Sequence, residues 1–247
     1  MIQTQQLTKR FGEKTAVEPI DLDIAAGTFF CFLGPNGAGK TTTIKMMTGL
    51  LRPSGGTVRV GGIDVQEDPV SAKQCMGYVP DHPFLYDKLT GREFMRFVAG
   101  LYRLPEDYYQ AHCEELLEMF EISHVGDQLV EDYSHGMRQK LSFASCFLHD
   151  PKVVIVDEPW VGLDPKNIRF VKDFLKEKTR NEGLTVFMST HTLSIAEEVA
   201  DQIGIINQGT LLELGTVEEI KALHENPGSL EDIFLTLTQT EEEMATS

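Results

Sequence analysis

The 247 residues are 41% hydrophobic and 24% charged, which is typical of a globular protein and enough for one large domain. The formal net charge of −16 argues against direct binding of nucleic acid, because a duplex binder presents a basic face. The four cysteines show no metal-ligand spacing, and no apolar run approaches the ~20 residues that span a bilayer, so a membrane process would require another chain.

The N-terminal third is predicted to be rich in strands. Ile2–Leu7 is a candidate strand, and Val17–Ile24 alternates apolar and polar residues as a half-buried strand does. Phe29–Leu33 is continuously apolar, which indicates a central strand buried on both faces. Gly61-Gly62 predicts a tight turn directly after the strand residues Thr57–Val60.

A glycine-rich segment follows the buried strand: Gly34-Pro35-Asn36-Gly37-Ala38-Gly39-Lys40-Thr41. It fits the phosphate-loop pattern, in which glycines let backbone N–H groups turn inward around a phosphate. Lys40 is expected to contact the β and γ phosphates, Thr41 to ligate Mg²⁺, and Thr42 to bond an α or β phosphate oxygen. A chance match in a turn is the alternative, but the segment lies between a strand and a helical pattern at Ile44, Met47, Leu50 and Leu51.

The middle of the chain is predicted to be helical. Thr90 and Glu93 form a capping-box pattern ahead of a helix over Phe94–Leu104. Two further helices are expected over Glu106–Phe120 and Ser134–Leu148. Together they predict a helical subdomain at residues 88–148, inserted into an α/β core.

A second buried strand, Val153–Val156, ends in the adjacent carboxylates Asp157 and Glu158. Two neighbouring buried acids repel each other unless a cation or a proton separates them. Asp157 is therefore a candidate Mg²⁺ ligand, and Glu158 is a candidate catalytic residue that orients and polarises the attacking water. Without a phosphate loop, an exposed strand end would be as good an interpretation. His191 follows the predicted strand Thr185–Ser189 at the same end of the sheet, where a γ-phosphate sensor would lie.

The last third contains a helix, a hairpin and a tail. Asp164 is expected to cap a helix that begins at Pro165. Asn207-Gln208-Gly209 predicts the turn of a hairpin, because apolar runs flank it on both sides. Residues 216–247 are expected to form a C-terminal helical tail.

These motifs resemble those of the ATP-binding cassette (ABC) family once one more segment is added: Tyr133-Ser134-His135-Gly136-Met137-Arg138-Gln139-Lys140. Ser134 and Gly136 match the signature sequence of the family, whereas His135 and Met137 depart from it. Similar departures are tolerated in the branch that serves ABC-2-type exporters, which this chain resembles. The resemblance covers nearly the whole chain as one ABC ATPase domain, residues 1–247. It implies an α/β fold: a P-loop NTPase core with a mixed parallel sheet, an antiparallel β subdomain and the helical insertion.

The resemblance also implies the rest of the site. Phe11 would stack on the adenine, and the nucleotide-binding loop would comprise Gly34, Pro35, Asn36, Gly37, Ala38, Gly39, Lys40, Thr41 and Thr42. Ser134 and Gly136 would contact the γ-phosphate held by a second subunit. Asp81 stands in place of the switch-loop glutamine of the family and is expected to reach Mg²⁺ or the water, although an ionised carboxylate cannot donate a hydrogen bond. The segment Gly162-Leu163-Asp164-Pro165 matches the D-loop, which crosses the dimer interface.

The implied function is that of the ATP-binding subunit of an ABC transporter, an ATPase that uses ATP and Mg²⁺. The chain carries one set of motifs, so ATP is expected to join two copies, or this chain and a related subunit, head to tail. An integral membrane permease would be the other partner and would place the chain in the cytoplasm, on the inner face of the membrane. The likeness to the ABC-2 branch favours export of a lipid, a drug or an ion.

The alternative function is that of a soluble ABC-type ATPase which assembles or remodels a cytosolic complex, because its motifs would be the same. A DNA-repair or chromosome ATPase is disfavoured, since the interval between Thr42 and Tyr133 holds neither heptads nor paired cysteines. A translation factor of this family would carry two cassettes in one chain, whereas this chain carries one set of motifs.

Overall fold

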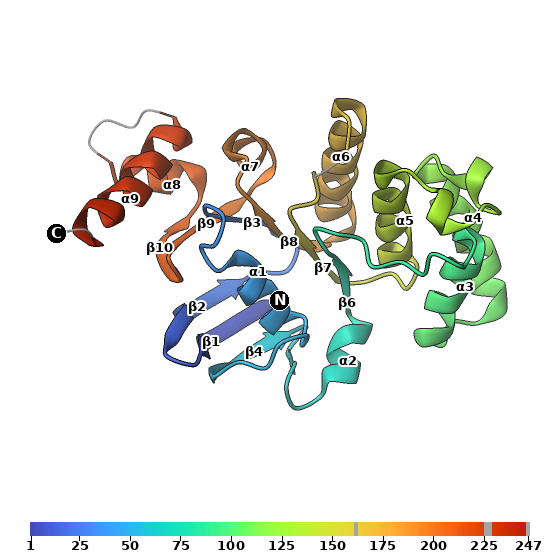
Figure 1. Cartoon of the computed structure of the whole chain (residues 1–247), viewed down its shortest axis with the longest axis horizontal. Helices are drawn as coiled ribbons and strands as arrows, with labels where there is room; N and C mark the ends of the chain where they lie inside the picture. The colour runs from blue at the N-terminus through green and yellow to red at the C-terminus, as the bar shows by residue number, and fades with distance from the viewer. Residues whose placement is uncertain (161–162, 225–228, 246–247) are drawn as a thin grey trace.

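The computed structural model describes residues 1–160, 163–224 and 229–245 of the chain. Within them, the larger sheet has six strands in the order β10-β9-β3-β8-β7-β6 (Figure 1). Neighbouring strands are parallel except for the antiparallel pair β9–β10. The strands are β3 (Phe29–Leu33), β6 (Met76–Val79), β7 (Val153–Asp157), β8 (Thr185–Thr190), β9 (Gln202–Asn207) and β10 (Thr210–Gly215). Every residue of β3 is buried, which confirms the prediction of a central strand.

A smaller antiparallel sheet lies beside helix α1 (Lys40–Met47), as the blue strands in Figure 1 show. In the described residues its order is β2-β1-β4-β5, and its strands are β1 (Ile2–Phe11), β2 (Lys14–Ile24), β4 (Gly55–Val60) and β5 (Ile63–Asp64). Gly61 and Gly62 join β4 to β5 with φ angles of 61° and 82°. This left-handed pair confirms the predicted turn, because two positive φ angles suit a two-residue hairpin and favour glycine.

The side chains of β3 alternate between two hydrophobic cores. Phe30 and Phe32 pack with α1 and the smaller sheet, whereas Phe29, Cys31 and Leu33 pack toward the helices on the other face. Because successive residues of a strand point to opposite faces, five apolar residues in a row fill both cores. Each buried phenylalanine contributes about 1.5–3 kcal/mol relative to an exposed one, so β3 is held firmly at the centre of the sheet.

The helices lie around these sheets. In the described residues they are α1, α2 (Pro69–Gln74), α3 (Gly91–Leu101), α4 (Glu106–Met119), α5 (His135–Phe147), α6 (Pro165–Glu182), α7 (Leu193–Val199), α8 (Val217–Ala222) and α9 (Leu230–Ala245), with short 3₁₀ turns at Ser123–Val125 and Val130–Asp132. Figure 1 places α3, α4 and α5 at one end of the molecule and α8 and α9 at the other. None of the helices in the described part of the chain combines the length and apolarity needed to cross a bilayer.

Several local predictions are confirmed by the structure. The capping box of Thr90 and Glu93 is present at the start of α3. Asp164 caps α6, which begins at Pro165, and Gln208-Gly209 forms the turn between β9 and β10. The predicted D-loop glycine, Gly162, lies outside the described residues, as do residues 225–228 and 246–247 of the predicted tail.

Two helix ends were predicted wrongly. The first helix ends at Met47, so Leu50 and Leu51 lie outside it, and Leu50 is 59% exposed. Gly49 follows the helix with a φ of 68°, a left-handed conformation that commonly terminates helices. The next predicted helix ends at Leu101 instead of residue 104.

The helices at residues 91–147 share one hydrophobic cluster with the main sheet. Leu117 and Phe143 belong to the same core as Val154 and Met188. Packing is therefore continuous between these helices and the strands. The division into an α/β core and an inserted subdomain at 88–148 stays an interpretation of the sequence.

Candidate active site

The glycine-rich loop connects β3 to α1. Gly37 and Gly39 have φ angles of 83° and 110°, which L side chains rarely adopt. Gly39 is also the N-cap of α1 and supplies no side-chain hydrogen bond to the helix. The first N–H groups of α1 thus lack a side-chain cap, and the positive end of the helix can receive an anion.

Gly34 is required for a different reason, close approach of the backbone. A Cβ atom there would lie 2.4 Å from the carbonyl oxygen of Ile206 in β9. We expect Gly34→Ala to lower the free energy of unfolding by about 1–3 kcal/mol, because the chain must move to relieve this overlap. Urea denaturation measures the change. In the matched variant Gly37→Ala the new Cβ meets no atom within 4 Å, and only the cost of the left-handed φ, about 1 kcal/mol, is expected. Equal losses in the two variants would contradict the steric explanation.

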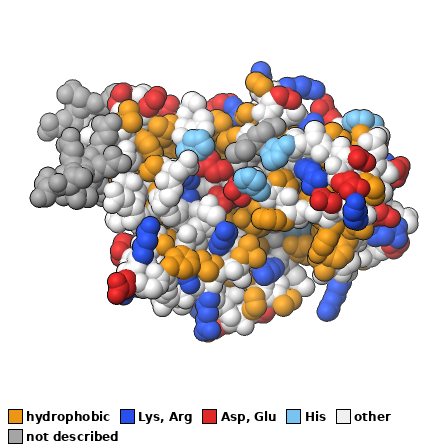
Figure 2. Space-filling view, viewed as in Figure 1, with side chains coloured by type: hydrophobic (Ala, Val, Ile, Leu, Met, Phe, Trp, Pro, Cys, Tyr) orange, Lys and Arg blue, Asp and Glu red, His pale blue; other side chains and the backbone are white. Residues whose placement is uncertain are grey.

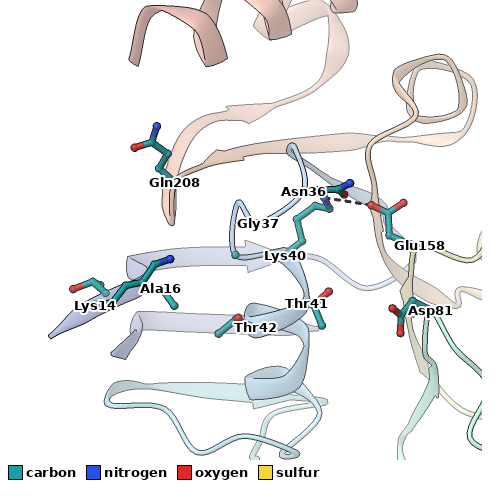
Figure 3. Close-up of a pocket in the computed structure, with 12 residues that line it drawn as sticks. Lys14, Ala16, Asn36, Gly37, Lys40, Thr41, Thr42, Asp81, Glu158 and Gln208 are labelled. Carbon is teal, nitrogen blue, oxygen red and sulfur yellow. Dashed lines mark ion pairs between the residues drawn. The ribbon is translucent and has the colours of Figure 1, made fainter. Parts of the chain in front are cut away.

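Lys40 is buried at the centre of the loop, with 6% of its surface exposed. Its Nζ donates to the carbonyl oxygens of Gly34 and Pro35, at 2.6 Å and 3.1 Å. It also forms an ion pair of 3.3 Å with Oε1 of Glu158, the dashed line in Figure 3. The ammonium group is therefore held in place by its own loop and by the carboxylate that follows β7.

Asp157 is the last residue of β7 and is fully buried. Its Oδ1 accepts a hydrogen bond of 2.6 Å from the Ser189 hydroxyl, while its buried Oδ2 has no hydrogen-bond partner in the described chain. Burial raises the pKa of the Asp157 carboxyl. The nearby hydroxyls of Ser189 and Thr41 oppose that rise, and the charges of Asp81 and Glu158 add to it. An orphaned carboxylate oxygen close to a hydroxyl and to further acids fits a hard divalent cation.

Protein side chains alone do not form a complete metal cage at this point. Among the described residues, no group of three or more His, Cys, Asp or Glu side chains is arranged to hold a metal ion. Mg²⁺ commonly takes one or two carboxylates and completes its octahedral shell with water and substrate phosphates. Asp157 and Thr41 fit that mode of binding.

Glu158 is held between a cation and an imidazole. Its Oε2 lies 2.9 Å from Nδ1 of His191, on the opposite side from the ion pair with Lys40. Its backbone N–H donates to the carbonyl oxygen and to the hydroxyl of Ser189, both at 3.2 Å. Its φ of 45° is unusual for a residue with a side chain, and such strain costs about 1–3 kcal/mol. Contacts at both carboxylate oxygens and at the backbone N–H therefore fix the direction of this carboxylate.

Lys40 and Glu158 meet at a cavity of about 720 Å³. Figure 3 shows Lys40, Thr41, Thr42 and Glu158 along it, together with Asp81. Its other lining residues are Lys14, Thr15, Ala16, Asn36, Gly37, Gly39 and Gln208. Sequence reasoning missed Lys14, Thr15, Ala16 and Gln208. The hairpin signal at Gln208 was visible, but only the fold brings that turn to the phosphate loop.

Several predicted residues do not line this cavity: Gly34, Pro35, Ala38, Asp157 and His191, and also Phe11, Ser134 and Gly136. Phe11, at the end of β1, is 51% exposed, and the Lys9 ammonium lies 5.0 Å from its ring centre. Ser134 is the N-cap of α5 and accepts a hydrogen bond from the N–H of Met137, with Gly136 in the first turn. The site within one chain therefore lacks the signature segment.

Asp81 belongs to the loop that connects β6 to α3, and this loop contacts the signature segment. His82 Nδ1 lies 3.0 Å from Asp81 Oδ2, and the ring of His82 meets that of His135 edge to face at 6.5 Å. Farther along the loop, Asp87 forms an ion pair of 2.7 Å with Arg138 of α5. The loop thus links the cavity to the start of α5.

Comparisons with known proteins agree on one family. The sequence model described as "ABC transporter" matches residues 17–161. The chain is 36% identical over 227 residues to the daunorubicin resistance ATP-binding protein DrrA3 of Streptomyces coeruleorubidus, which covers 92% of this chain and 71% of that protein. It is 37% identical over 220 residues to the bacitracin transport ATP-binding protein BcrA of Enterococcus faecalis, with 89% and 70% covered. A solved structure of the ATP-binding subunit of an ABC transporter superposes with a TM-score of 0.90 at 30% identity, over 96% of this chain and 99% of that one.

Proposed function

Because this chain belongs to the ABC transporter family, we propose that it works as one of a pair of subunits that drive export through a separate membrane permease. The chain is an ATPase and the ATP-binding subunit of an ABC transporter. The observation that carries the proposal is the series of contacts from Lys40 to Glu158 to His191, of which Lys40 and Glu158 line the nucleotide cavity. The names of the two relatives, daunorubicin resistance and bacitracin transport, favour a drug among the proposed cargoes, which also include lipids and ions.

The proposed binding of ATP places its phosphates over the N-terminus of α1. Backbone N–H groups of residues 34–42 would surround them, with the Thr42 hydroxyl on an α or β phosphate oxygen. Lys40 would exchange its contacts with the loop carbonyls and Glu158 for β and γ phosphate oxygens. A phosphate offers the ammonium a full charge-assisted contact, so the exchange is favourable.

Thr41, Asp157 and Asp81 are the proposed ligands of Mg²⁺, directly or through water. The unpartnered Oδ2 of Asp157 supports this assignment, since a buried carboxylate oxygen left without a partner costs about 1–3 kcal/mol or more. Bound Mg²⁺ would neutralise negative charge on the phosphates. An acid at position 81, where the family has glutamine, adds one more negative charge near the same point.

Glu158 is the proposed residue that orients and deprotonates the attacking water. When Lys40 turns to the γ-phosphate, Oε1 of Glu158 loses its cation and becomes free to accept from water. His191, which directly follows β8, keeps Oε2 in place meanwhile and is the proposed contact of the γ-phosphate. The proton of the water would thus pass to the carboxylate while its oxygen bonds to the γ-phosphorus, and the bond from that phosphorus to the β–γ bridging oxygen would break, so that ADP leaves.

A second subunit supplies the missing part of the proposed site. Ser134 is the exposed N-cap of α5, a 13-residue helix, and Gly136 lies in its first turn; neither residue lines the cavity of its own chain. A hydroxyl and helix N–H groups suit a γ-phosphate. Head-to-tail pairing of two chains would bring α5 of one chain to the ATP of the other.

The proposed permease contact is an exposed hydrophobic patch made of Phe84, Tyr86, Phe97 and Leu101. These side chains are 86%, 56%, 39% and 66% exposed, and a hollow of about 280 Å³ lies between Tyr86 and Phe97. Figure 2 shows hydrophobic side chains gathered on the side of the molecule where Figure 1 places α3. Exposed apolar clusters commonly mark interaction sites. The loop that carries Phe84 also carries Asp81. Only a few residues of this loop would therefore separate a permease bound here from the nucleotide cavity.

Purification of the chain with its membrane partner tests this proposal. We expect Tyr86→Glu to reduce the recovery of a polytopic membrane protein at least tenfold, because a buried tyrosine at an interface commonly contributes about 2 kcal/mol or more. Leu223→Glu is the matched control, since Leu223 ends α8 far from the patch and is 67% exposed. Equal recovery with both variants would place the contact on another face.

The alternative function, a soluble ATPase that remodels a cytosolic complex, has the same nucleotide site. The same purification separates the two, because the alternative predicts cytosolic partners and no polytopic protein. The exposed patch favours the transporter. The proposed location is therefore the inner face of the cell membrane, through the permease.

A further inference from the structure

The cavity has two chemically different ends. Lys40, Thr41 and Glu158 mark the end proposed for the phosphates, whereas Lys14, Thr15, Ala16 and Gln208 line the other end. Figure 3 shows Lys14, Ala16 and Gln208 on the opposite side of Lys40 from Glu158 and Asp81. A nucleotide with its γ-phosphate near Glu158 must therefore extend its base toward Gln208.

The turn that carries Gln208 is fixed to both neighbouring elements. The N–H of Gly209 donates to the carbonyl oxygen of Ala38 in the phosphate loop, at 2.9 Å. The carbonyl oxygen of Gly209 accepts from the N–H of Glu18 in β2, also at 2.9 Å. The position of Gln208 relative to the phosphate loop is thus set by backbone hydrogen bonds, while its exposed side chain can rotate over a bound base.

Gln208 also occupies a conformation that its side chain disfavours. Its φ is 47° and that of Gly209 is 85°. In such a two-residue turn, asparagine or glycine is the residue of least strain at the first position. The glutamine side chain reaches farther than that of asparagine, the other amide. This longer reach is a reason for its presence beside a ligand despite the strain.

A carboxamide is chemically matched to one purine edge. Adenine presents an amino group, a donor, next to a ring nitrogen, an acceptor, and glutamine offers an acceptor and a donor at the same spacing. A 6-oxo purine presents two acceptors on its N7 edge, which suit lysine or arginine and meet the carbonyl oxygen of glutamine unfavourably. Lys14, at this end of the cavity, offers donors alone and so cannot select adenine.

We propose that Gln208 is a specificity-determining residue that reads the edge of the adenine base and makes the site prefer ATP to 6-oxo purine nucleotides. The inference rests on the proposed nucleotide site. It assigns to the β9–β10 turn a part separate from the stacking suggested for Phe11, because stacking uses the face of the base and is nearly indifferent to its edge.

The test compares the affinities of the chain for ATP and for inosine triphosphate, in which an oxo group replaces the 6-amino group. Calorimetric titration of the wild type should give a preference of about tenfold for ATP, the lower range for a bidentate base contact. In Gln208→Gly the turn keeps its left-handed conformation without strain, ATP should bind about tenfold more weakly, and inosine triphosphate should bind no more weakly than before. Thr210→Ala changes an exposed residue of the same hairpin outside the cavity and should retain the preference.

The outcomes are distinct. A preference that survives in Gln208→Gly, or a wild type that binds both nucleotides equally, overturns the role of Gln208. A wild type that prefers inosine triphosphate assigns the base end to Lys14 and also overturns the inference. If the wild type bound neither ATP nor inosine triphosphate, the result would instead refute the nucleotide site itself. Unfolding midpoints of Gln208→Gly and the wild type confirm that the turn is intact.

Discussion

Glu158→Gln is expected to lower the rate of ATP hydrolysis by about 10²- to 10⁴-fold, the usual contribution of a positioned general base. The glutamine keeps the shape of the side chain and a polar contact to His191, but it cannot take the proton of the attacking water. Phosphate release at saturating ATP measures the loss. Glu177→Gln, an exposed acid of α6, makes the same change of charge and should leave the rate unchanged.

The same variant should hold ATP at least as tightly as the wild type. The carboxylate of Glu158 lies 3.3 Å from the Lys40 ammonium and competes with the γ-phosphate for it, so the neutral amide removes a competitor. With binding intact and hydrolysis blocked, ATP should keep two chains together, which light scattering would detect as a doubled mass. Wild-type turnover in the variant would remove Glu158 from the mechanism, and a monomer saturated with ATP would contradict head-to-tail pairing.

Lys40→Ala is expected to weaken ATP binding by about 30- to 4,000-fold. Loss of one member of a buried, hydrogen-bonded charge pair costs about 2–5 kcal/mol, and each 1.4 kcal/mol is tenfold in affinity. The alanine variant also leaves Glu158 without its cation, so negative charge near the phosphates rises. Titration with a fluorescent ATP analogue, in the presence of Mg²⁺, measures the change.

The matched control for this variant is Lys45→Ala. Lys45 lies in the last turn of the same helix with its side chain exposed, so its removal changes the charge of α1 but no contact of the loop. ATP affinity should remain within a factor of about three in this variant, because exposed charges interact weakly through solvent. Equal losses in the two variants would show that only the charge of the helix matters.

The fold was largely predictable because local sequence patterns identify its strands. β3 and residues Val153–Val156 of β7 are apolar throughout, and a glycine-rich loop follows the first whereas the carboxylates Asp157 and Glu158 follow the second. Glycine pairs and capping boxes marked the turns and the helix starts for the same local reason. The end of α1 was misjudged because apolar residues continue past Gly49 at helical spacing, and backbone conformation, not hydrophobicity, stops the helix.

The cavity wall was less predictable, since it is assembled from residues distant in the sequence. Gln208 reaches the phosphate loop only through hydrogen bonds of Gly209 to residues 18 and 38, and no local pattern encodes that contact. The contact of Glu158 with Lys40 is similar, because two strands that are not neighbours in sequence must first lie in one sheet. The chemical roles of the motif residues could be assigned from the sequence. Which residues face each other across the cavity could be known only from the fold.

The strand order has a consequence for how the chain is made. β3 has β8 and β9 as its neighbours, and these begin at residues 185 and 202. During synthesis on the ribosome, the segment that bears the phosphate loop therefore emerges early and then waits, unpaired, for some 150 residues that must follow it. Such late pairing of distant strands slows folding and leaves an apolar strand exposed to aggregation. Nascent chains of this protein are thus expected to expose β3 until both β8 and β9 have been made.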